Sequence, residues 1–466
     1  MCKVNKKKLS FRCLAFFYAF FHKSTKNKLI LHSIKCITMN IVELYRLFLT
    51  HPNITTDSRN CPERSIFFAL KGENFDGNGF AEKAIENGAS YAVIDNPAYQ
   101  KDERFLLVDN ALGTLRELAA YHRKQLHIPV VGITGTNGKT TTKELTAAVL
   151  SKKYRTLYTQ GNLNNHIGVP LTLLRINAMH EMAIIEMGAN HPGEIKDSVT
   201  IVRPTHGIIT NVGKAHIEGF GSFDNIVKTK AELYDFLREN RGEIFINKNN
   251  AHLNKVAAGL KQHTYAAGDT SANVCGEIGE CNPFISVKWR LNNISYETRT
   301  NLIGSYNLEN ILAAICIGNH FGVTPEAIGE AIGEYIPQNN RSQLTQTEHN
   351  RLIIDTYNAN PTSMEAALTN FDQVKNFSNK VVLLGDMLEL GTESNCEHVR
   401  MVNLIEQFNF KAFLVGKEFA AATTKYPTFA SIDDFIEWQK QHPLIGCSIL
   451  IKGSHGIHLE KAIPYL

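Results

Sequence analysis

The sequence predicts an α/β protein of three domains, and three observations support this fold class. Its 466 residues correspond to about three domains at roughly 150 residues each. Buried strands alternate with amphipathic helices along most of the chain, an order typical of parallel, doubly wound sheets. The composition is 43% apolar and 20% charged with both signs mixed, which excludes a disordered, collagen-like or low-complexity chain.

Residues 1–39 differ from the remainder in charge. They hold nine of the 49 Lys and Arg residues and no acidic residue, which leaves 40 basic against 45 acidic residues in the body of the protein. A mildly acidic body gives no support to nucleic-acid binding. The nine cysteines are scattered without a CxxC pair, so they form neither a disulfide framework nor a zinc site and favour a reducing, cytoplasmic setting.

Met39 begins the segment MNIVELYRLFL, whose apolar spacing predicts an amphipathic helix. We expect the folded chain to start there, with residues 1–38 as a non-native or disordered extension read through from upstream sequence. The apolar segment 14–21 leaves two alternatives open, a mobile anchor and an export signal. It is short, however, and no small-residue cleavage site follows it. No apolar run approaches the 18 residues of a membrane span.

Three blocks follow one another along the rest of the chain. Residues 39–127 predict a smaller α/β domain, with SIFFALKG and YAVID as strands and FAEKAIENGA and LGTLRELAAYHRKQ as helices. Residues 128–336 predict a central domain, in which the strand PVVGIT leads through a Gly-rich turn to a helix, and MAIIEMGA and THGIITNVG are further strands. Residues 337–466 predict a Rossmann-like domain with the strands RLIID, KVVLLG, KAFLVG and SILIKG, beginning at a polar turn after Pro337.

The Gly-rich turn of the central block is the strongest local motif, GITGTNGKTTTK from Gly132 to Lys143. It lies between a buried strand and an amphipathic helix, where backbone N–H groups and the helix N-terminus can bind phosphate. Lys139 can reach the β- and γ-phosphates, and the Thr140 hydroxyl can bind Mg²⁺. Ile133 takes the first glycine position of the strict GxxxxGK[ST] pattern, so a plain Gly-rich turn is the alternative.

Three further side chains suit a metal–phosphate site. Glu186 ends the strand AIIE at the edge where open α/β sheets bind ligands, His216 follows the next strand, and Lys230 lies on a predicted helix. Each has a simpler alternative: a solvated carboxylate, a structural histidine and a surface lysine. Their order around the phosphate loop favours the shared site.

These motifs together resemble the Mur ligases. The resemblance extends from about residue 54 to 456 and is carried by GTNGKTTTK, IIEMGANHPGEI, ITNVGKAHIEGFGS, KTKAEL, DTYNANPTSM, LLGDMLELG and KGSHG. DTYNANP and LGDMLELG are typical of the dipeptide-adding branch. The resemblance implies an N-terminal domain that binds a UDP-sugar, a central P-loop-type ATPase domain and a C-terminal domain that closes over the site.

The resemblance also implies roles for individual residues. The segments TTDSR, 55–59, and FFALKGENFDG, 67–77, match those that hold the uridine nucleotide. The implied ATP contacts are Gly135, Thr136, Asn137, Gly138, Lys139, Thr140, Thr141, Asn307, Arg341 and Asn358. The implied substrate contacts are Ser58, Arg59, Lys71, Asn162, Asn164 and Asn165. The implied metal ligands are Thr140, Glu186, His216 and Lys230 as a carbamate, and the implied catalytic residues are Lys139, Lys230 and His216.

Two positions depart from the family pattern. Tyr306 stands where the motif GxHNxxNxxAA has histidine, and His455 stands where relatives often carry arginine. Asn307 remains the expected adenine contact, and no role follows for Tyr306.

The reaction implied by the resemblance is ATP-dependent amide formation in peptidoglycan precursor synthesis. The chain would add D-alanyl-D-alanine to UDP-N-acetylmuramoyl-tripeptide through an acyl phosphate, with ATP and Mg²⁺, as a cytoplasmic monomer. Two alternatives stay open: another ligase of the superfamily, such as a folylpolyglutamate synthase or a different Mur step, and a catalytically silent nucleotide-binding regulator.

Overall fold

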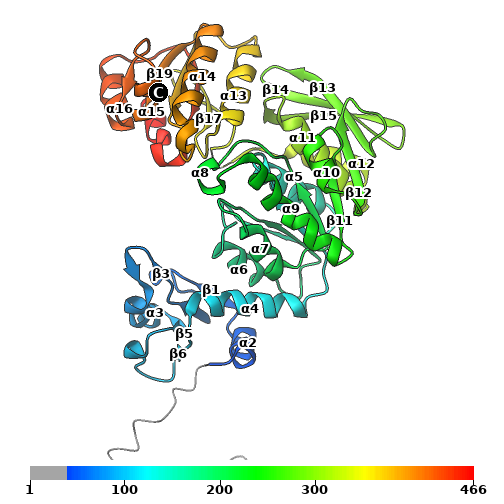
Figure 1. The fold of residues 1–466 in the computed structure, drawn as a ribbon, viewed down its shortest axis with the longest axis vertical. Coiled ribbons are helices and arrows are strands. Elements are labelled where there is room, and N and C mark those ends of the chain that lie inside the picture. Colours follow the sequence, from blue (N-terminus) through cyan, green and yellow to red (C-terminus); the bar gives the residue numbers. More distant parts are fainter. Residues whose placement is uncertain (1–38, 339) are drawn as a thin grey trace, which may run out of the picture.

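The computed structural model describes residues 39–338 and 340–466, so the expectations for residues 1–38 lie outside it. Three α/β domains follow one another along the chain, with the central domain between the other two (Figure 1). The predicted fold class is confirmed. None of the helices within the described ranges is both long and apolar enough to cross a membrane.

The N-terminal domain is a four-stranded parallel sheet in the order β1-β2-β5-β6. Its first helix begins after Asn40, whose side chain accepts hydrogen bonds from the N–H groups of Val42 and Glu43. The strands are β1 (Asn53–Thr55), β2 (Ser65–Phe68), β5 (Ala89–Ile94) and β6 (Phe105–Leu107), the small hairpin is β3 (Lys71–Gly72) and β4 (Phe75–Asp76), and the helices are α2 (Ile41–Thr50), α3 (Ala81–Glu86) and α4 (Ala111–Gln125).

The central domain is a nine-stranded sheet in the order β15-β14-β13-β12-β11-β10-β7-β9-β8. The strands from β8 to β13 run parallel, as alternating strands and helices predict. They are β7 (Val130–Thr134), β8 (Thr156–Tyr158), β9 (Met182–Glu186), β10 (His206–Ile209), β11 (Glu243–Asn247), β12 (Lys261–Ala267) and β13 (Val274–Cys281).

Helices cover both faces of this sheet. Val130 packs into one buried cluster and its neighbour Val131 into another, because successive strand residues point to opposite faces. One face carries α5 (Lys139–Ser151), α11 (Asn307–His320) and α12 (Pro325–Glu334); the other carries α6 (Gly168–Leu173), α7 (Glu194–Val202), α8 (Ile217–Phe220), α9 (Phe223–Glu239) and α10 (Ala251–Val256).

An antiparallel extension of the central sheet has no counterpart in the sequence-based prediction. It consists of β14 (Phe284–Leu291) and β15 (Ile294–Ile303), which pair with each other and with β13. Asn292 and Asn293 connect them, both with positive φ, the conformation that tight hairpin turns require. The Asn-Asn pair between two alternating runs is the signal that identifies this hairpin.

The C-terminal domain has a six-stranded sheet in the order β16-β17-β21-β18-β19-β20, parallel except for β16. Its strands are β16 (Gln343–Gln346), β17 (Arg351–Asp355), β18 (Lys380–Gly385), β19 (Lys411–Val415), β20 (Thr428–Phe429) and β21 (Ser448–Lys452), and its helices are α13 (Pro361–Gln373), α14 (Ser394–Gln407), α15 (Lys417–Ala422) and α16 (Ile432–Gln441).

The three domains are not joined in the same way. One apolar cluster runs from Leu44 and Leu115 of the N-terminal domain to Leu173 and Leu233 of the central domain, with α4 packed on α6 and α7. In the C-terminal domain, Ile303 is the one member of the buried clusters contributed by the central domain within the described chain. Apolar packing therefore holds the first two domains together, whereas the third is attached mainly by polar contacts.

Candidate nucleotide and substrate site

The loop between β7 and α5 has a conformation that its glycines make possible. Gly135 and Gly138 have φ of 143° and 76°. A Cβ on Gly135 would lie 2.0 Å from Oγ1 of Thr210, and one on Gly138 would lie 2.4 Å from Oδ1 of Asn310. Both positions therefore exclude side chains, and the loop forms a narrow glycine cradle before α5. The N–H groups of Thr136 and Asn137 bond to Asn211, so the first N–H groups of α5, which lack intrahelical partners, are the ones that can bind phosphate.

Lys139 is folded back onto this loop. Its Nζ donates hydrogen bonds to the carbonyl oxygens of Gly135 and Thr136, both at 2.8 Å. Burial lowers the pKa of Lys139 to about 8; Arg341 lowers it further, and Glu186 opposes the change. A phosphate group would offer this ammonium better acceptors than two carbonyls.

Thr140 and Glu186 lie side by side at the carboxyl ends of the strands. The Thr140 hydroxyl donates to the Glu186 carboxylate at 3.0 and 3.2 Å, and both residues are buried. Nδ2 of Asn164 donates to the same carboxylate at 2.8 Å. A hydroxyl oxygen next to a carboxylate is a donor pair that suits Mg²⁺, so these residues fit the implied ion.

Lys143 is a member of this cluster that sequence reasoning missed. Its side chain is fully buried, with Nζ 3.8 Å from Oε2 of Glu186 and 3.7 Å from Oε1 of Glu144. Burial lowers its pKa, against the opposing effect of both carboxylates. It sits one helical turn after Lys139, on the same face of α5, which is the spacing that could have identified it.

Lys230 is buried on α9, as a carbamylated lysine would require. It is 2% exposed, and its Nζ lies 3.4 Å from the carbonyl oxygen of Ala189 and 5.4 Å from the ring centre of Phe220. Burial lowers its pKa to about 7, and the Lys139 charge lowers it further. The surface-lysine alternative is wrong.

Lys230 does not form an ion pair with Glu232, two residues further along α9. The Glu232 carboxylate instead accepts hydrogen bonds from the backbone N–H groups of Gly193 and Lys196, at 3.2 and 2.7 Å. It thereby stabilises the N-terminus of α7.

His216 faces the C-terminal domain rather than the Glu186 cluster. Its Nδ1 contacts the carboxylate of Glu389, and the neighbouring Lys214 forms an ion pair with Glu393 at 2.9 Å. His216 has a positive φ of 52° and immediately precedes α8. The structure thus brings Thr140 and Glu186 together and gives His216 a different partner.

A pair of amides joins the phosphate loop to the C-terminal domain. Nδ2 of Asn360 donates to Oδ1 of Asn137 at 2.7 Å, and Nδ2 of Asn137 donates back at 3.4 Å. Asn360 lies in DTYNANP, where it also caps α13. It was not singled out from the sequence, although it stands two residues after the predicted contact Asn358, which is exposed.

Arg341 lies on the hinge segment and close enough to lower the pKa values of Lys139 and Lys143. Its guanidinium carbon lies 3.6 Å from the ring centre of Tyr357. Its Nε is buried, with no hydrogen-bond partner within the described residues. An unpartnered buried donor next to the phosphate loop fits an anionic ligand.

Asn307 is tied to the phosphate loop by a chain of side chains. Its Oδ1 accepts from Nδ2 of Asn310 at 2.8 Å, and Oδ1 of Asn310 accepts from the Thr142 hydroxyl at 3.1 Å. Thr141, the remaining predicted loop contact, is half-buried in the first turn of α5. Tyr306 donates to or accepts from Ser342 at 2.7 Å, so the residue that replaces the family histidine contacts the C-terminal domain.

The predicted uridine segment lies on the N-terminal domain. The Arg59 side chain is 87% exposed and donates to both oxygens of Asp57 at 2.9 Å, which lowers the pKa of that carboxyl to about 2. Ser58 is half-buried, and Lys71 on the β3–β4 hairpin pairs with Asp95 at 3.0 Å. The structure does not gather these residues at the phosphate loop.

The segment GNLNNHIGVP, 161–170, leads into α6 and has two structural roles. Oδ1 of Asn165 accepts from the N–H groups of Ile167 and Gly168 at 3.1 and 2.8 Å, which caps the helix. Asn164 binds Glu186, as described above, whereas Asn162 is exposed. Of the three substrate contacts predicted in this segment, Asn162 and Asn165 are therefore exposed, and Asn164 faces the buried carboxylate.

A phosphate loop with a buried threonine–carboxylate pair, on a doubly wound sheet between two further α/β domains, defines a nucleotide-binding protein of three domains. The sequence matches three family models along its length: "Mur ligase family, catalytic domain" over residues 51–133, "Mur ligase middle domain" over 133–318 and "Mur ligase, glutamate ligase domain" over 340–455.

Individual relatives match over nearly the whole chain. The UDP-N-acetylmuramoyl-tripeptide–D-alanyl-D-alanine ligase of Bacillus subtilis (strain 168) is 32% identical, over 93% of this chain and 98% of the relative. The enzyme of the same name from Escherichia coli (strain K12) is 34% identical, over 91% and 95%. A crystal structure of MurF from Acinetobacter baumannii superposes with a TM-score of 0.79 and 32% identity, over 88% and 92%. The chain belongs to the Mur ligase family.

Proposed function

We propose that this chain is an ATP-dependent, ADP-forming amide ligase that adds D-alanyl-D-alanine to UDP-N-acetylmuramoyl-tripeptide in peptidoglycan precursor synthesis. The observation that carries the proposal is the likeness, over nine-tenths of the chain, to enzymes with this printed activity. The nucleotide site supports it, because its glycine cradle, buried lysine and threonine–carboxylate pair suit ATP and Mg²⁺.

The reaction must first activate the terminal carboxylate of the tripeptide. A carboxylate oxygen attacks the γ-phosphorus of ATP, the bond from that phosphorus to ADP breaks, and an acyl phosphate forms. The amine of D-alanyl-D-alanine then attacks the acyl carbon, phosphate leaves with its oxygen, and the nitrogen loses a proton. Chemistry of this kind depends mainly on positioning and on charge neutralisation.

Specific residues supply these two functions in the proposed reaction. Lys139 exchanges its loop carbonyls for phosphate oxygens, and Arg341 contributes a second positive charge from the hinge. Thr140 and Glu186 would hold Mg²⁺, which spreads the negative charge of the phosphates when bound. Lys230 would join them as a carbamate, since an ammonium cannot ligate a cation, and a buried amine with a lowered pKa can react with CO₂.

The other predicted contacts belong to the two substrates. Ser58, Arg59 and Lys71 would bind the uridine nucleotide, and the segment from Asn162 to Asn165 would line the peptide side of the site. Asn307 and Asn358 would contact the nucleotide. We expect the protein to act as a monomer in the cytoplasm, where ATP is available; the six cysteines of the described ranges are free thiols, which suits a reducing compartment.

An ADP-release assay with a substrate panel tests the function. We expect ADP only when ATP, UDP-N-acetylmuramoyl-tripeptide and D-alanyl-D-alanine are all present, with omission of each in turn as the control. ADP release with a folate and glutamate, or with a single amino acid in place of the dipeptide, would assign the chain to another ligase of the superfamily. Nucleotide binding without ADP release on any combination would favour the silent regulator.

A further inference from the structure

A cluster of one glutamate, Glu243, and three histidines, His206, His263 and His320, lies near the ends of the central strands that are opposite the phosphate loop. His206 and Glu243 are the first residues of β10 and β11, and His320 is the last residue of α11. The phosphate loop follows Thr134, the last residue of β7. Strands β7 and β10 run parallel, and His206 pairs with Val131 at the opposite end of β7. A strand of four residues spans about 13 Å, so the cluster is separate from the nucleotide site.

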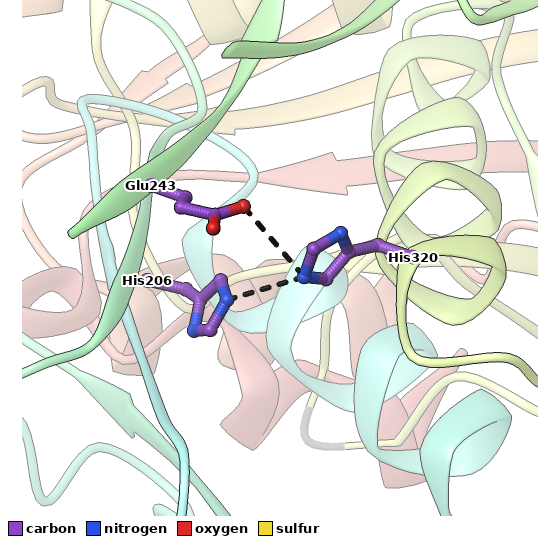
Figure 2. Close-up of side chains that lie close together, drawn as sticks. All are labelled: His206, Glu243 and His320. Atoms are coloured by element: carbon purple, nitrogen blue, oxygen red, sulfur yellow. Dashed lines mark hydrogen bonds and ion pairs between the residues drawn. The ribbon is translucent and has the colours of Figure 1, made fainter. Parts of the chain in front are cut away.

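The ligand atoms of three of these residues point toward one another (Figure 2). Nε2 of His320 lies 3.2 Å from Nε2 of His206 and 4.0 Å from Oε2 of Glu243. All three ligand atoms lie within 4.8 Å of one another. Ligands at 2.0–2.2 Å from a tetrahedral Zn²⁺ are about 3.4 Å apart, so a small side-chain movement would give three of the four positions.

The surroundings hold the three side chains in this arrangement. The rings of Phe245 and Phe321 pack against His206, with centroids 6.0 and 4.9 Å away. The same two rings flank His320 at 5.4 and 4.7 Å. Because aromatic packing restricts both imidazoles, little conformational entropy would be lost when a cation binds.

Hydrogen bonds around the cluster also suit ligation. Thr205 Oγ1 lies 2.9 Å from Nδ1 of His206 and also reaches the backbone carbonyl of Val130. When the hydroxyl donates to that carbonyl, Nδ1–H of His206 donates to Thr205 and Nε2 keeps a free lone pair. Nε2 of His263 lies 2.6 Å from Oε2 of Glu243, which fixes the orientation of the carboxylate.

We propose that His206, Glu243 and His320 form a binding site for a divalent transition metal of the Zn²⁺ type. Two imidazole nitrogens and one carboxylate oxygen favour Zn²⁺ over Mg²⁺, which prefers oxygen ligands. The ion connects the starts of β10 and β11 to the end of α11, the helix whose first turn contacts the phosphate loop through Asn310. Its role is therefore to fix α11 on the sheet.

Zinc retention by the full chain tests the site. The protein is stripped with EDTA, incubated with Zn²⁺ in millimolar Mg²⁺, passed through gel filtration and assayed for metal. His206→Gln, Glu243→Gln and His320→Gln are compared with His252→Gln, an exposed histidine of α10 in the same domain. We expect each cluster variant to retain one ion fewer per chain than the wild type, and His252→Gln to match the wild type.

Two further readouts distinguish metal binding at this site from binding at the thiols or at other histidines of the chain. Co²⁺ should give the visible d–d bands of a tetrahedral site without intense thiolate charge transfer, and these bands should be lost in His320→Gln. Zn²⁺ should raise the melting temperature of the wild type by a few degrees. It should not change the melting temperature of the Glu243→Gln variant, which keeps the shape of the side chain.

Equal zinc retention in the wild type and all cluster variants, or no retention by the wild type, would overturn the proposal. A hydrogen-bonded histidine cluster without metal would produce the second result.

Discussion

Asn137 and Asn360 exchange amide hydrogen bonds between the phosphate loop and the C-terminal domain, at 2.7 and 3.4 Å. Asn360 has a second role, because its Oδ1 caps α13 by accepting from the N–H of Ser363 at 3.0 Å. The two roles can be separated, since serine caps helices about as well as asparagine but cannot form the amide pair.

The variant Asn360→Ser should therefore remove the amide pair and lower activity while it keeps the cap of α13. We expect roughly tenfold lower kcat/KM for ATP, because each lost hydrogen bond contributes about 1 kcal/mol. Because α13 keeps its cap, the free energy of unfolding should fall by no more than about 2 kcal/mol, the contribution of the two lost hydrogen bonds. Steady-state kinetics and urea unfolding measure the two effects, with Thr324→Ser as the control, a cap of α12 that has no bond to another domain. Unchanged kinetics would show that the amide pair does not serve catalysis.

Arg59→Ala should weaken binding of the UDP-linked tripeptide and leave ATP binding unchanged. Arg59 lies on the N-terminal domain. Its guanidinium is exposed and can give up its ion pair with Asp57 to bind the UDP-linked tripeptide. A charge-assisted hydrogen bond predicts a loss of about tenfold or more in affinity. Arg104→Ala is the matched control, because Arg104 pairs with Asp102 two residues earlier in the same way. Equal titration curves for the two variants would remove Arg59 from the binding site.

Lys230→Ala should abolish turnover while the fold stays intact, if the carbamate is the working form. Lys230→Arg should also be inactive, because guanidinium cannot be carbamylated. A short carboxylate such as acetate should restore part of the activity of Lys230→Ala, and Lys228→Ala, an exposed lysine two residues earlier, should remain active. An active Lys230→Arg enzyme contradicts the carbamate.

The buried amine of Lys230 also makes stability depend on pH. Its pKa is about 7 in the folded chain against 10.5 ordinarily, with burial as the largest cause. Between these values the unfolded chain binds a proton that the folded chain has released, so the contribution of this group to stability rises with pH across that window. In CO₂-free buffer, Lys230→Met should stabilise the protein most below pH 7, with the gain declining toward pH 10. Lys228→Met, at an exposed position two residues earlier, is the control.

Ligands should draw the domains together. The predicted uridine contacts belong to the N-terminal domain, the phosphate loop to the central domain, and Arg341 to the segment that leads into the third domain. The central domain lies between the other two (Figure 1). Because the first two domains share an apolar cluster and the third does not, we expect the third domain to move. Small-angle scattering should show a smaller radius of gyration with an ATP analogue and the UDP-linked tripeptide together than with either alone. An unchanged radius argues against closure.

Local patterns predicted much of the fold and part of the site. The Gly-rich turn between a strand and a helix identified the loop that holds Lys139 and Thr140, and the end of an apolar strand identified Glu186. These features depend on neighbours in the sequence. The burial of Lys143 could not be read in this way, because it results from the packing of α5 between the sheet and distant segments.

Contacts between residues far apart in the sequence were beyond prediction for the same reason. His206 and His320 are 114 positions apart, and no motif spacing connects them. The contact of His216 with Glu389 depends on how the third domain docks, which is a property of the assembled chain.

The contact between His216 and Glu389 links two equilibria, the docking of the third domain and the binding of a cation by His216. One imidazole cannot bind a carboxylate of the third domain and a cation at the same time through the same nitrogen. A cation that recruits Nδ1 of His216 must therefore loosen the docked third domain, and docking must lower the affinity for that cation by the same factor, since thermodynamic coupling is reciprocal. The Asn137–Asn360 amide pair and the Lys214–Glu393 ion pair would then hold the interface, and the attraction of the ion pair weakens as ionic strength rises.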